Sequence, residues 1–148
     1  MDKRNDKLVV KCYCPRHSPW GVVEDFAKIG NGLFRVETPS HGGFWLSQER
    51  KAMMPDVVAS VKTFGDLGDM GWYEEDCDWI LPVLAFPWLF PDTDVARAVW
   101  IIQNRKDLQS MKTWEWYMES DTDVAIYVRG KVRNAEHSAN SMVGKVGY

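Results

Sequence analysis

Over the first third of the chain, apolar and polar residues alternate in short runs. This alternation is typical of β-strands, whose side chains point to opposite faces in turn. Residues 22–29 and 33–38 flank Gly30-Asn31-Gly32, where glycine and asparagine accept a positive φ at low steric cost. These two segments predict a β-hairpin, although residues 22–29 by themselves also fit a single helical turn. Residues 44–46 predict a third short strand, and the β-branched run at residues 8–14 predicts an edge strand.

The spacing of apolar positions lengthens to that of a helix in the middle of the chain. Ser47 predicts the N-cap of a helix that starts at Gln48 and ends at Pro55. A second short helix is expected over residues 56–64. The strongest helical pattern covers residues 73–86, with a bend where a proline interrupts it.

The last third of the chain predicts a helix over residues 92–107, which residues 114–118 continue after an interruption. A weak alternation at residues 124–128 predicts a last strand, and the small, polar residues 131–148 predict a loosely ordered end. Together these elements predict an α+β fold, in which a small antiparallel sheet of a hairpin and short strands packs against several short helices. The length suits a single domain over residues 1–148.

Composition indicates a folded protein, because 45% of the residues are hydrophobic and 26% are charged. No apolar run reaches the roughly 20 residues of a membrane-spanning helix, and the charged start of the chain lacks the pattern of a secretory signal. The cysteines are Cys12, Cys14 and Cys77, an odd number that argues against a disulfide framework. We therefore expect a cytoplasmic protein without membrane contact, in a reducing compartment.

Charge is distributed unevenly, although the net charge is only −3. Residues 63–96 contain eight acidic residues and no lysine or arginine, whereas basic residues gather near the two ends of the chain. This distribution argues against direct binding of nucleic acid through the central region. It favours a protein partner that has a basic surface.

Cys12, Cys14 and His17 offer thiolate and imidazole ligands of the kind that bind zinc. The usual pair of cysteines separated by two residues is absent, and a tetrahedral site needs a fourth ligand. Small thiols that pack on a strand explain the same residues without a metal. We predict no metal and no cofactor, and keep these three residues as the alternative ligand set.

His41 lies in a glycine-flanked loop, Pro39-Ser40-His41-Gly42-Gly43. Its imidazole can act as an acid or a base near neutral pH, with Glu75 or Asp76 as its partner. A simple turn, in which the histidine bonds to backbone, explains the same sequence. Recognised motifs for phosphate, dinucleotide, zinc or calcium binding are missing, as is the serine-containing elbow of hydrolases.

An acidic block over residues 74–78 places like charges about one helical turn apart. Such clusters bind basic side chains or divalent cations, and a solvated helix N-terminus explains them equally well. We expect Cys77 to be buried and unreactive, and Trp88, in a proline-flanked stretch, to be one of the exposed rings. The predicted binding surface consists of Glu74, Glu75, Asp76, Asp78, Trp88 and His41.

Three segments of the chain stand out together: SPWG at residues 18–21, TPSHGG at residues 38–43 and GWYEEDCDW at residues 71–79. They resemble a small domain of unknown function found in proteins of phages, plasmids and the bacteria that host them. The resemblance covers about residues 18–91. It implies a mobile-element setting inside a bacterial host, and it carries no established activity.

From this setting we expect a non-catalytic, protein-binding accessory protein of a phage or other mobile element. Its acidic and aromatic surface would inhibit a host-defence effector that handles nucleic acid, in an anti-CRISPR or anti-restriction role. The alternative is a small hydrolase or transferase that uses His41 with Glu75 or Asp76 as an acid–base pair.

Overall fold

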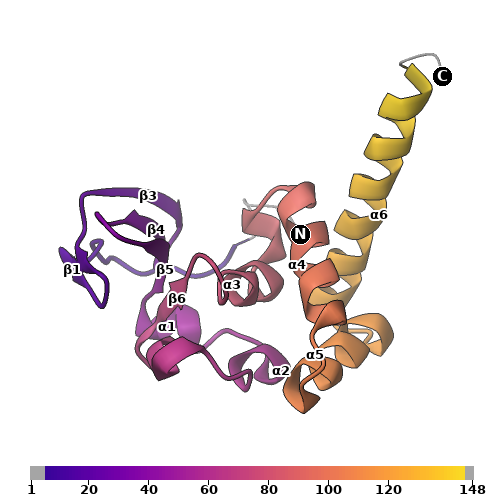
Figure 1. The fold of residues 1–148 in the computed structure, drawn as a ribbon. Coiled ribbons are helices and arrows are strands. Elements are labelled where there is room, and N and C mark those ends of the chain that lie inside the picture. The colour runs from indigo at the N-terminus through magenta and orange to yellow at the C-terminus, as the bar shows by residue number, and fades with distance from the viewer. Residues whose placement is uncertain (1–5, 146–148) are drawn as a thin grey trace.

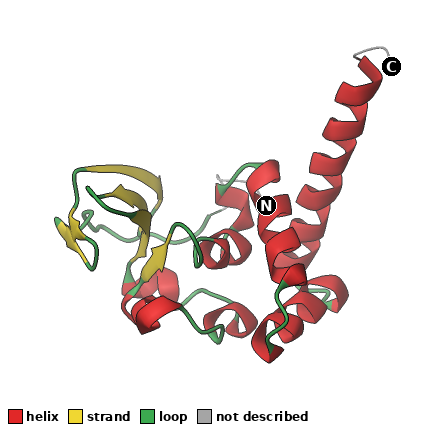
Figure 2. Ribbon diagram, viewed as in Figure 1, coloured by secondary structure: helices red, strands yellow, loops and turns green. Residues whose placement is uncertain are grey.

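The structure, a computed structural model, describes the backbone of residues 6–145 and the side chains as far as residue 139. Within these residues a four-stranded antiparallel sheet lies at one end and the longer helices at the other (Figures 1 and 2). The strands follow one another in the order β3 (Asp25–Gly30), β4 (Leu33–Glu37), β5 (Gly42–Leu46) and β6 (Trp72–Glu74). The predicted α+β class, with a small antiparallel sheet and short helices, is confirmed.

The predicted hairpin is formed by β3 and β4, which reverse through Asn31 and Gly32, with Gly32 at φ +70°. The first strand begins later than expected, because Val22 belongs to a separate two-stranded ribbon. That ribbon pairs β1 (His17–Ser18) with β2 (Gly21–Val22). The positive φ of Gly21, +122°, completes the tight turn between them.

The edge strand expected at residues 8–14 is absent, because this segment has no ladder partner in the described sheets. Instead it runs across one face of the sheet, where Cys12 and Cys14 pack against a cluster that includes Phe34 and Trp72. The alternation of its apolar residues therefore reflects packing on a surface, without strand pairing.

Three short helical segments lie between β5 and β6: α1 (Gln48–Lys51), α2 (Asp56–Ala59) and the 3-10 segment η2 (Phe64–Met70). The predicted N-cap is confirmed, because Ser47 Oγ accepts a hydrogen bond from the backbone N–H of Arg50 at 3.2 Å. The second helix is shorter than predicted.

The continuous helix predicted over residues 73–86 is wrong. Its first residues form β6, where Tyr73 pairs with Phe44 of β5, and a turn leads to α3 (Ile80–Ala85) and the 3-10 segment η3 (Pro87–Leu89). Pro82 lies in the first turn of α3, where a backbone N–H has no partner within the helix. The bend predicted at this proline is therefore not needed. Cys77 falls in the turn and is exposed, contrary to the prediction that it is buried.

Three longer helices complete the chain: α4 (Asp92–Asn104), α5 (Leu108–Glu119) and α6 (Asp123–Lys145). The predicted helix after residue 91 is confirmed as α4. The segment at residues 114–118 belongs to the separate helix α5, because Arg105 is extended and Asp107 caps a new start.

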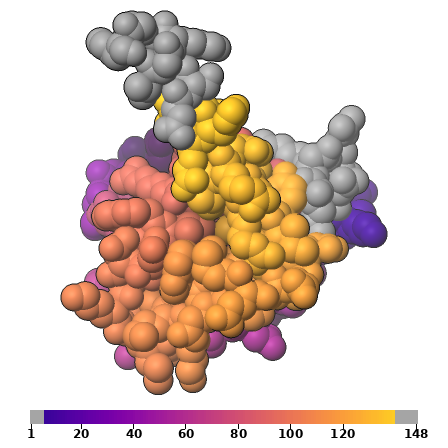
Figure 3. Space-filling model, turned by 90° about the vertical axis from the view of Figure 1, so that its right-hand side faces the viewer, coloured from indigo at the N-terminus to yellow at the C-terminus, as the bar shows by residue number. Residues whose placement is uncertain are grey.

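The strand predicted at residues 124–128 is wrong, since these residues form the first turns of α6. The loosely ordered end predicted from residue 131 stays a prediction: the structure assigns residues 131–145 to α6, and residues 146–148 lie outside the described part of the chain. Figure 3, which looks onto the helices, shows α6 rising above the rest of the molecule.

The sheet is covered on both faces. On one face Leu33, Leu46 and Tyr73 join the main core, to which α3 contributes five of its six buried residues. On the other face a smaller cluster of Phe34, Val36 and Trp72 is covered by the N-terminal segment.

Trp88 is part of the main core and only 7% exposed, so the prediction that it is an exposed ring is wrong. Its ring packs edge-on against Phe86 and Tyr127, and its Nε1–H donates to Asp6 Oδ1 at 3.2 Å. The flanking prolines turn the chain inward here, through the 3-10 segment η3.

Arg50 is fully buried and binds the N-terminal segment. Its guanidinium donates to both carboxylate oxygens of Asp6, at 2.9 and 2.6 Å, and its Nε donates to Asn31 O at 2.8 Å. The same group lies 4.8 Å from the centre of the Phe86 ring. These contacts connect the start of the described chain to the sheet and to the core.

Candidate functional site

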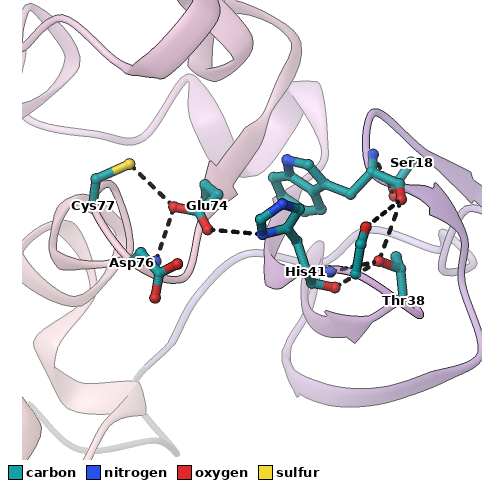
Figure 4. Close-up of polar contacts among 8 residues, drawn as sticks. Ser18, Thr38, His41, Glu74, Asp76 and Cys77 are labelled. Carbon is teal, nitrogen blue, oxygen red and sulfur yellow. Dashed lines mark hydrogen bonds and ion pairs between the residues drawn. The ribbon is translucent and has the colours of Figure 1, made fainter.

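The pairing of β5 with β6 brings the loop of His41 next to the acidic block. Gly43 is the ladder partner of Glu74, and the N–H of Glu75 donates to Gly42 O at 3.0 Å. Because His41 immediately precedes β5, its side chain lies beside Glu74 (Figure 4). Two motifs that are more than thirty residues apart in the sequence therefore form one surface.

Hydrogen bonds close the loop before β5 through backbone groups. The N–H of Thr38 donates to His41 O at 2.9 Å, and the N–H of His41 donates to Thr38 Oγ1 at 3.1 Å. Ser40 Oγ donates to Trp20 O at 3.2 Å and makes no hydrogen bond to His41. The loop is thus a turn, as one interpretation of the sequence held, but the imidazole of His41 remains free to face Glu74.

Glu74 is the buried centre of this site, with its side chain only 8% exposed. One carboxylate oxygen, Oε2, accepts hydrogen bonds from the N–H of Asp76 at 2.9 Å and from Cys77 Sγ at 3.1 Å. The other oxygen, Oε1, is buried and accepts no hydrogen bond. It lies 3.6 Å from His41 Nδ1, an ion-pair distance that is too long for a hydrogen bond (Figure 4).

Four side chains converge here, because one ligand atom from each of His41, Glu74, Glu75 and Asp76 lies within 4.8 Å of every other. Glu75 and Asp76 are exposed, and neither forms an ion pair with any described residue. A Cβ at Gly42 would lie 3.0 Å from the backbone oxygen of Val36 and 2.7 Å from Glu75 Oε2, so a larger residue here would displace the exposed side chain of Glu75.

A family model for a domain of unknown function, DUF7007, matches residues 13–123, which is three quarters of the chain. The chain belongs to the DUF7007 family. The predicted resemblance to an uncharacterised family is therefore confirmed, over a longer stretch than residues 18–91. No curated protein and no solved structure matches the chain.

The match contains the whole candidate site and ends where α6 begins. All four converging residues of the site thus belong to the DUF7007 domain. No helix in the described part of the chain has the length and apolar character needed to span a membrane.

Asp78 does not belong to the exposed acidic surface of the DUF7007 domain. Its side chain is buried, and its Oδ2 accepts a hydrogen bond from the N–H of Phe64 at 2.8 Å. Burial raises the pKa of this carboxyl, an effect that the hydrogen bond from Phe64 opposes. Of the acids predicted to bind a partner, only Glu75 and Asp76 are exposed, because Glu74 and Asp78 both face inward.

Cys77 connects the acidic site to a neighbouring cavity. Its thiol donates to Glu74, and its side chain also lines a cavity of about 520 Å³ together with Phe64, Asp78 and Arg105. Partial desolvation of the sulfur, followed by the hydrogen bond to Glu74, raises the pKa of the thiol to about 12. The thiol is therefore protonated at neutral pH, although it was expected to be inert for a different reason, namely burial.

The alternative ligand set of Cys12, Cys14 and His17 is not brought together as a metal cluster. The two cysteines are half-buried on the second face of the sheet, and His17 is exposed in β1. Burial raises the pKa of the Cys14 thiol, and the neighbouring Cys12 adds to this effect. These thiols pack as small apolar groups, as the simpler interpretation held.

Sequence reasoning missed the importance of Glu74 as the carboxylate that faces His41. It named Glu75 and Asp76 as the acid–base partners, and both do lie in the same cluster. The alternation of a strand was the available signal, because it places Trp72 and Glu74 on one face of β6. The predicted helix over this segment hid that signal.

Proposed function

We propose that this DUF7007 domain is a non-catalytic binding protein that uses Glu75 and Asp76 to engage a basic surface of a partner protein. The observation that carries this proposal is the exposure of both carboxylates without an ion pair to any described residue. Carboxylates that form no ion pair with the described residues are available to arginine or lysine of another protein.

An exposed aromatic ring is connected to the end of the acidic segment. Phe64 is 68% exposed, and its backbone N–H donates a hydrogen bond to Asp78. Phe64 also lines a cavity together with Cys77 and Asp78, and this cavity offers room for a side chain of the partner. Phe64 therefore takes the role that the sequence assigned to Trp88.

The proposed partner is a host-defence effector that holds nucleic acid, and the proposed setting is a phage or other mobile element within the cytoplasm of a bacterium. A channel that binds phosphates presents lysine and arginine side chains, which Glu75 and Asp76 can occupy in place of phosphate. Inhibition would follow because the protein and the nucleic acid compete for the same basic groups. An anti-CRISPR or anti-restriction protein could act by this competition.

The test is affinity capture from a lysate of a bacterium that carries restriction and CRISPR effectors, with bound proteins quantified by mass spectrometry. The double variant E75K/D76K is compared with the wild type and with E136K, which makes the same kind of charge change at an exposed residue of α6. We expect a nucleic-acid-handling protein that the wild type and E136K retain, and that E75K/D76K retains at least tenfold less.

Competition by a duplex oligonucleotide gives the second measurement, since it should release the captured protein. If the wild type and E75K/D76K retained equal amounts of the captured protein, the acidic surface would not be the binding surface. Retention that the oligonucleotide does not affect would contradict competition with nucleic acid.

A second candidate function is acid–base catalysis by a hydrolase or transferase, favoured by the convergence of His41 with Glu75 and Asp76. The ion-pair contact of His41 Nδ1 with Glu74 Oε1 would orient the imidazole. Hydrolysis of chromogenic carboxylic and phosphate esters by the wild type and by H41N tests this function. A wild-type rate equal to that of H41N would exclude it for these substrates.

A further inference from the structure

The buried oxygen Oε1 of Glu74 has no hydrogen-bond donor among the described residues. A buried carboxylate oxygen normally accepts at least one hydrogen bond, because leaving it unpaired costs about 1–3 kcal/mol or more. Here the other oxygen of the same carboxylate accepts two, while Oε1 accepts none. Oε1 instead points toward His41 Nδ1 (Figure 4), and Glu75 and Asp76 belong to the same cluster of possible ligands.

We propose that His41, Glu74, Glu75 and Asp76 bind one divalent transition-metal cation, of the Zn²⁺ or Mn²⁺ type, with Glu74 Oε1 as the buried ligand. This inference goes beyond the proposed partner binding and does not depend on it. One imidazole nitrogen and three carboxylate oxygens form a donor set that suits these ions.

The spacing of the four side chains fits a single ion. Ligand atoms at about 2.0–2.2 Å from a tetrahedral ion lie roughly 3.4 Å from one another. The four donors already lie within 4.8 Å of each other, and three of them, His41, Glu75 and Asp76, belong to exposed side chains that can rotate inward. Only small side-chain movements are needed to complete the coordination.

Glu74 itself is positioned by its neighbours, as metal ligands commonly are. The N–H of Asp76 and the thiol of Cys77 both donate to Oε2, which leaves Oε1 directed at the site. Backbone pairing of Gly43 with Glu74, and of Gly42 with Glu75, fixes the distance between the two segments. The site thus lies on a β-ladder, which is a rigid support.

Electrostatics favours a cation at the same place. Three carboxylates lie close together, and among the described residues no lysine or arginine forms an ion pair with any of them. Within the described part of the chain, their ion-pair partner is the imidazole of His41, which is neutral when it acts as a ligand. A divalent ion would offset the mutual repulsion of the carboxylates and satisfy Oε1.

The test is isothermal titration of the full chain, stripped with a chelator and dialysed, with Zn²⁺, Mn²⁺ and Ca²⁺ in separate experiments. We expect one ion per chain for Zn²⁺ or Mn²⁺, binding at least tenfold tighter than Ca²⁺. The variants E74Q and H41A should each weaken the binding at least tenfold, and E136Q should leave it unchanged.

Two controls keep the assignment falsifiable. The variant C12S/C14S must retain the binding, since loss in this variant would move the site to the cysteines. H41A changes an exposed residue, so it tests the site even if E74Q fails to fold. Absence of binding, binding unaffected by E74Q and H41A, or Ca²⁺ affinity equal to that of Zn²⁺ and Mn²⁺ would each overturn the proposal.

Discussion

At the scale of single residues, the thiol of Cys77 shows how one buried carboxylate controls a neighbouring group. Cys77 is exposed, yet its S–H is held by Glu74 Oε2 at 3.1 Å. The thiol form donates this hydrogen bond, and the thiolate would face the negative charges of Asp78 and Glu74. Cys77 is therefore exposed to solvent and nevertheless unreactive, because its thiol stays protonated.

We predict that Cys77 reacts slowly with iodoacetamide in spite of its exposure. A pKa of about 12 leaves roughly one thiol in ten thousand ionised at pH 8, against about one in ten for an ordinary thiol of pKa 9. Because the pKa is raised, the rate should climb about tenfold for each pH unit between 8 and 11. Peptide mass spectrometry resolves the modification at Cys77 from that at Cys12 and Cys14.

E74Q should accelerate this alkylation, since it removes the negative charge near the sulfur and weakens the hydrogen bond that favours the thiol. E136Q is the matched control and should have no effect. A Cys77 rate at pH 8 equal to that of a free cysteine would contradict the raised pKa.

Individual residues of the site were only partly predictable. His41 in its glycine-flanked loop and the acidic block were both visible as candidates, because glycine spacing and like charges are local properties. The burial of Glu74 and Asp78, by contrast, follows from contacts with Gly43 and Phe64, which are distant in sequence. Local patterns carry no record of such contacts, so neighbouring acids with equal formal charge could not be sorted into buried and exposed.

At the scale of elements, residues 73–86 show how a largely correct periodicity can describe the wrong structure. Cys77, which the helical pattern placed inside, is exposed. Tyr73, Ile80 and Leu84 are all buried, as the pattern required. Yet Tyr73 is buried through strand pairing with Phe44, and the others through α3. The helical pattern extends over many more residues than this three-residue strand, so it outweighed the alternation of the strand. The hairpin and α4 were predictable because their signals lie within one element.

The helix α6 divides into a packed part and a projecting part. Ala125 and Val128 are fully buried against the core, and Lys131 pairs with Asp92 at 3.3 Å. From Arg133 to Ala139 the residues are exposed or half-exposed (Figure 3). Isolated helical turns without packing are only marginally stable in water.

We predict that equal substitutions in the two parts of α6 have unequal effects. A125G should lower the free energy of unfolding by about 1–2 kcal/mol, from lost helix propensity and a lost buried methyl group. A139G should change it by less than about 0.5 kcal/mol, because Ala139 is exposed beyond the packed turns. Urea denaturation measures both values, and equal losses would show that the projecting part also supports the core.

At the scale of the whole molecule, a single ion pair joins the covering segment of the sheet to the main core. Asp6 accepts hydrogen bonds from Arg50 and from Trp88, and both of its bonded partners are buried. When one partner of a buried ion pair is removed, the other charge is left without a counter-charge in a low-dielectric interior. This carboxylate therefore connects the segment that covers one face of the sheet to buried groups of the core on the other.

We predict that D6A lowers the free energy of unfolding by about 3–5 kcal/mol, because it leaves the guanidinium of Arg50 buried without its counter-charge. D121A, at an exposed aspartate between α5 and α6, should change it by less than about 0.5 kcal/mol. Chemical denaturation followed by tryptophan fluorescence compares the two. A loss below 1 kcal/mol for D6A would mean that the guanidinium finds other partners.

The contact between Asp6 and Trp88 spans 82 residues of sequence. During synthesis on a ribosome, Asp6 emerges long before Trp88 has been added, since translation proceeds from the N-terminus at about 5–20 residues per second. The hydrogen bond from Trp88 to Asp6 therefore forms only after η3 has been synthesised, which is at least about four seconds after Asp6 at the upper rate. Attachment of the covering segment to the core is thus a late step in the maturation of the fold.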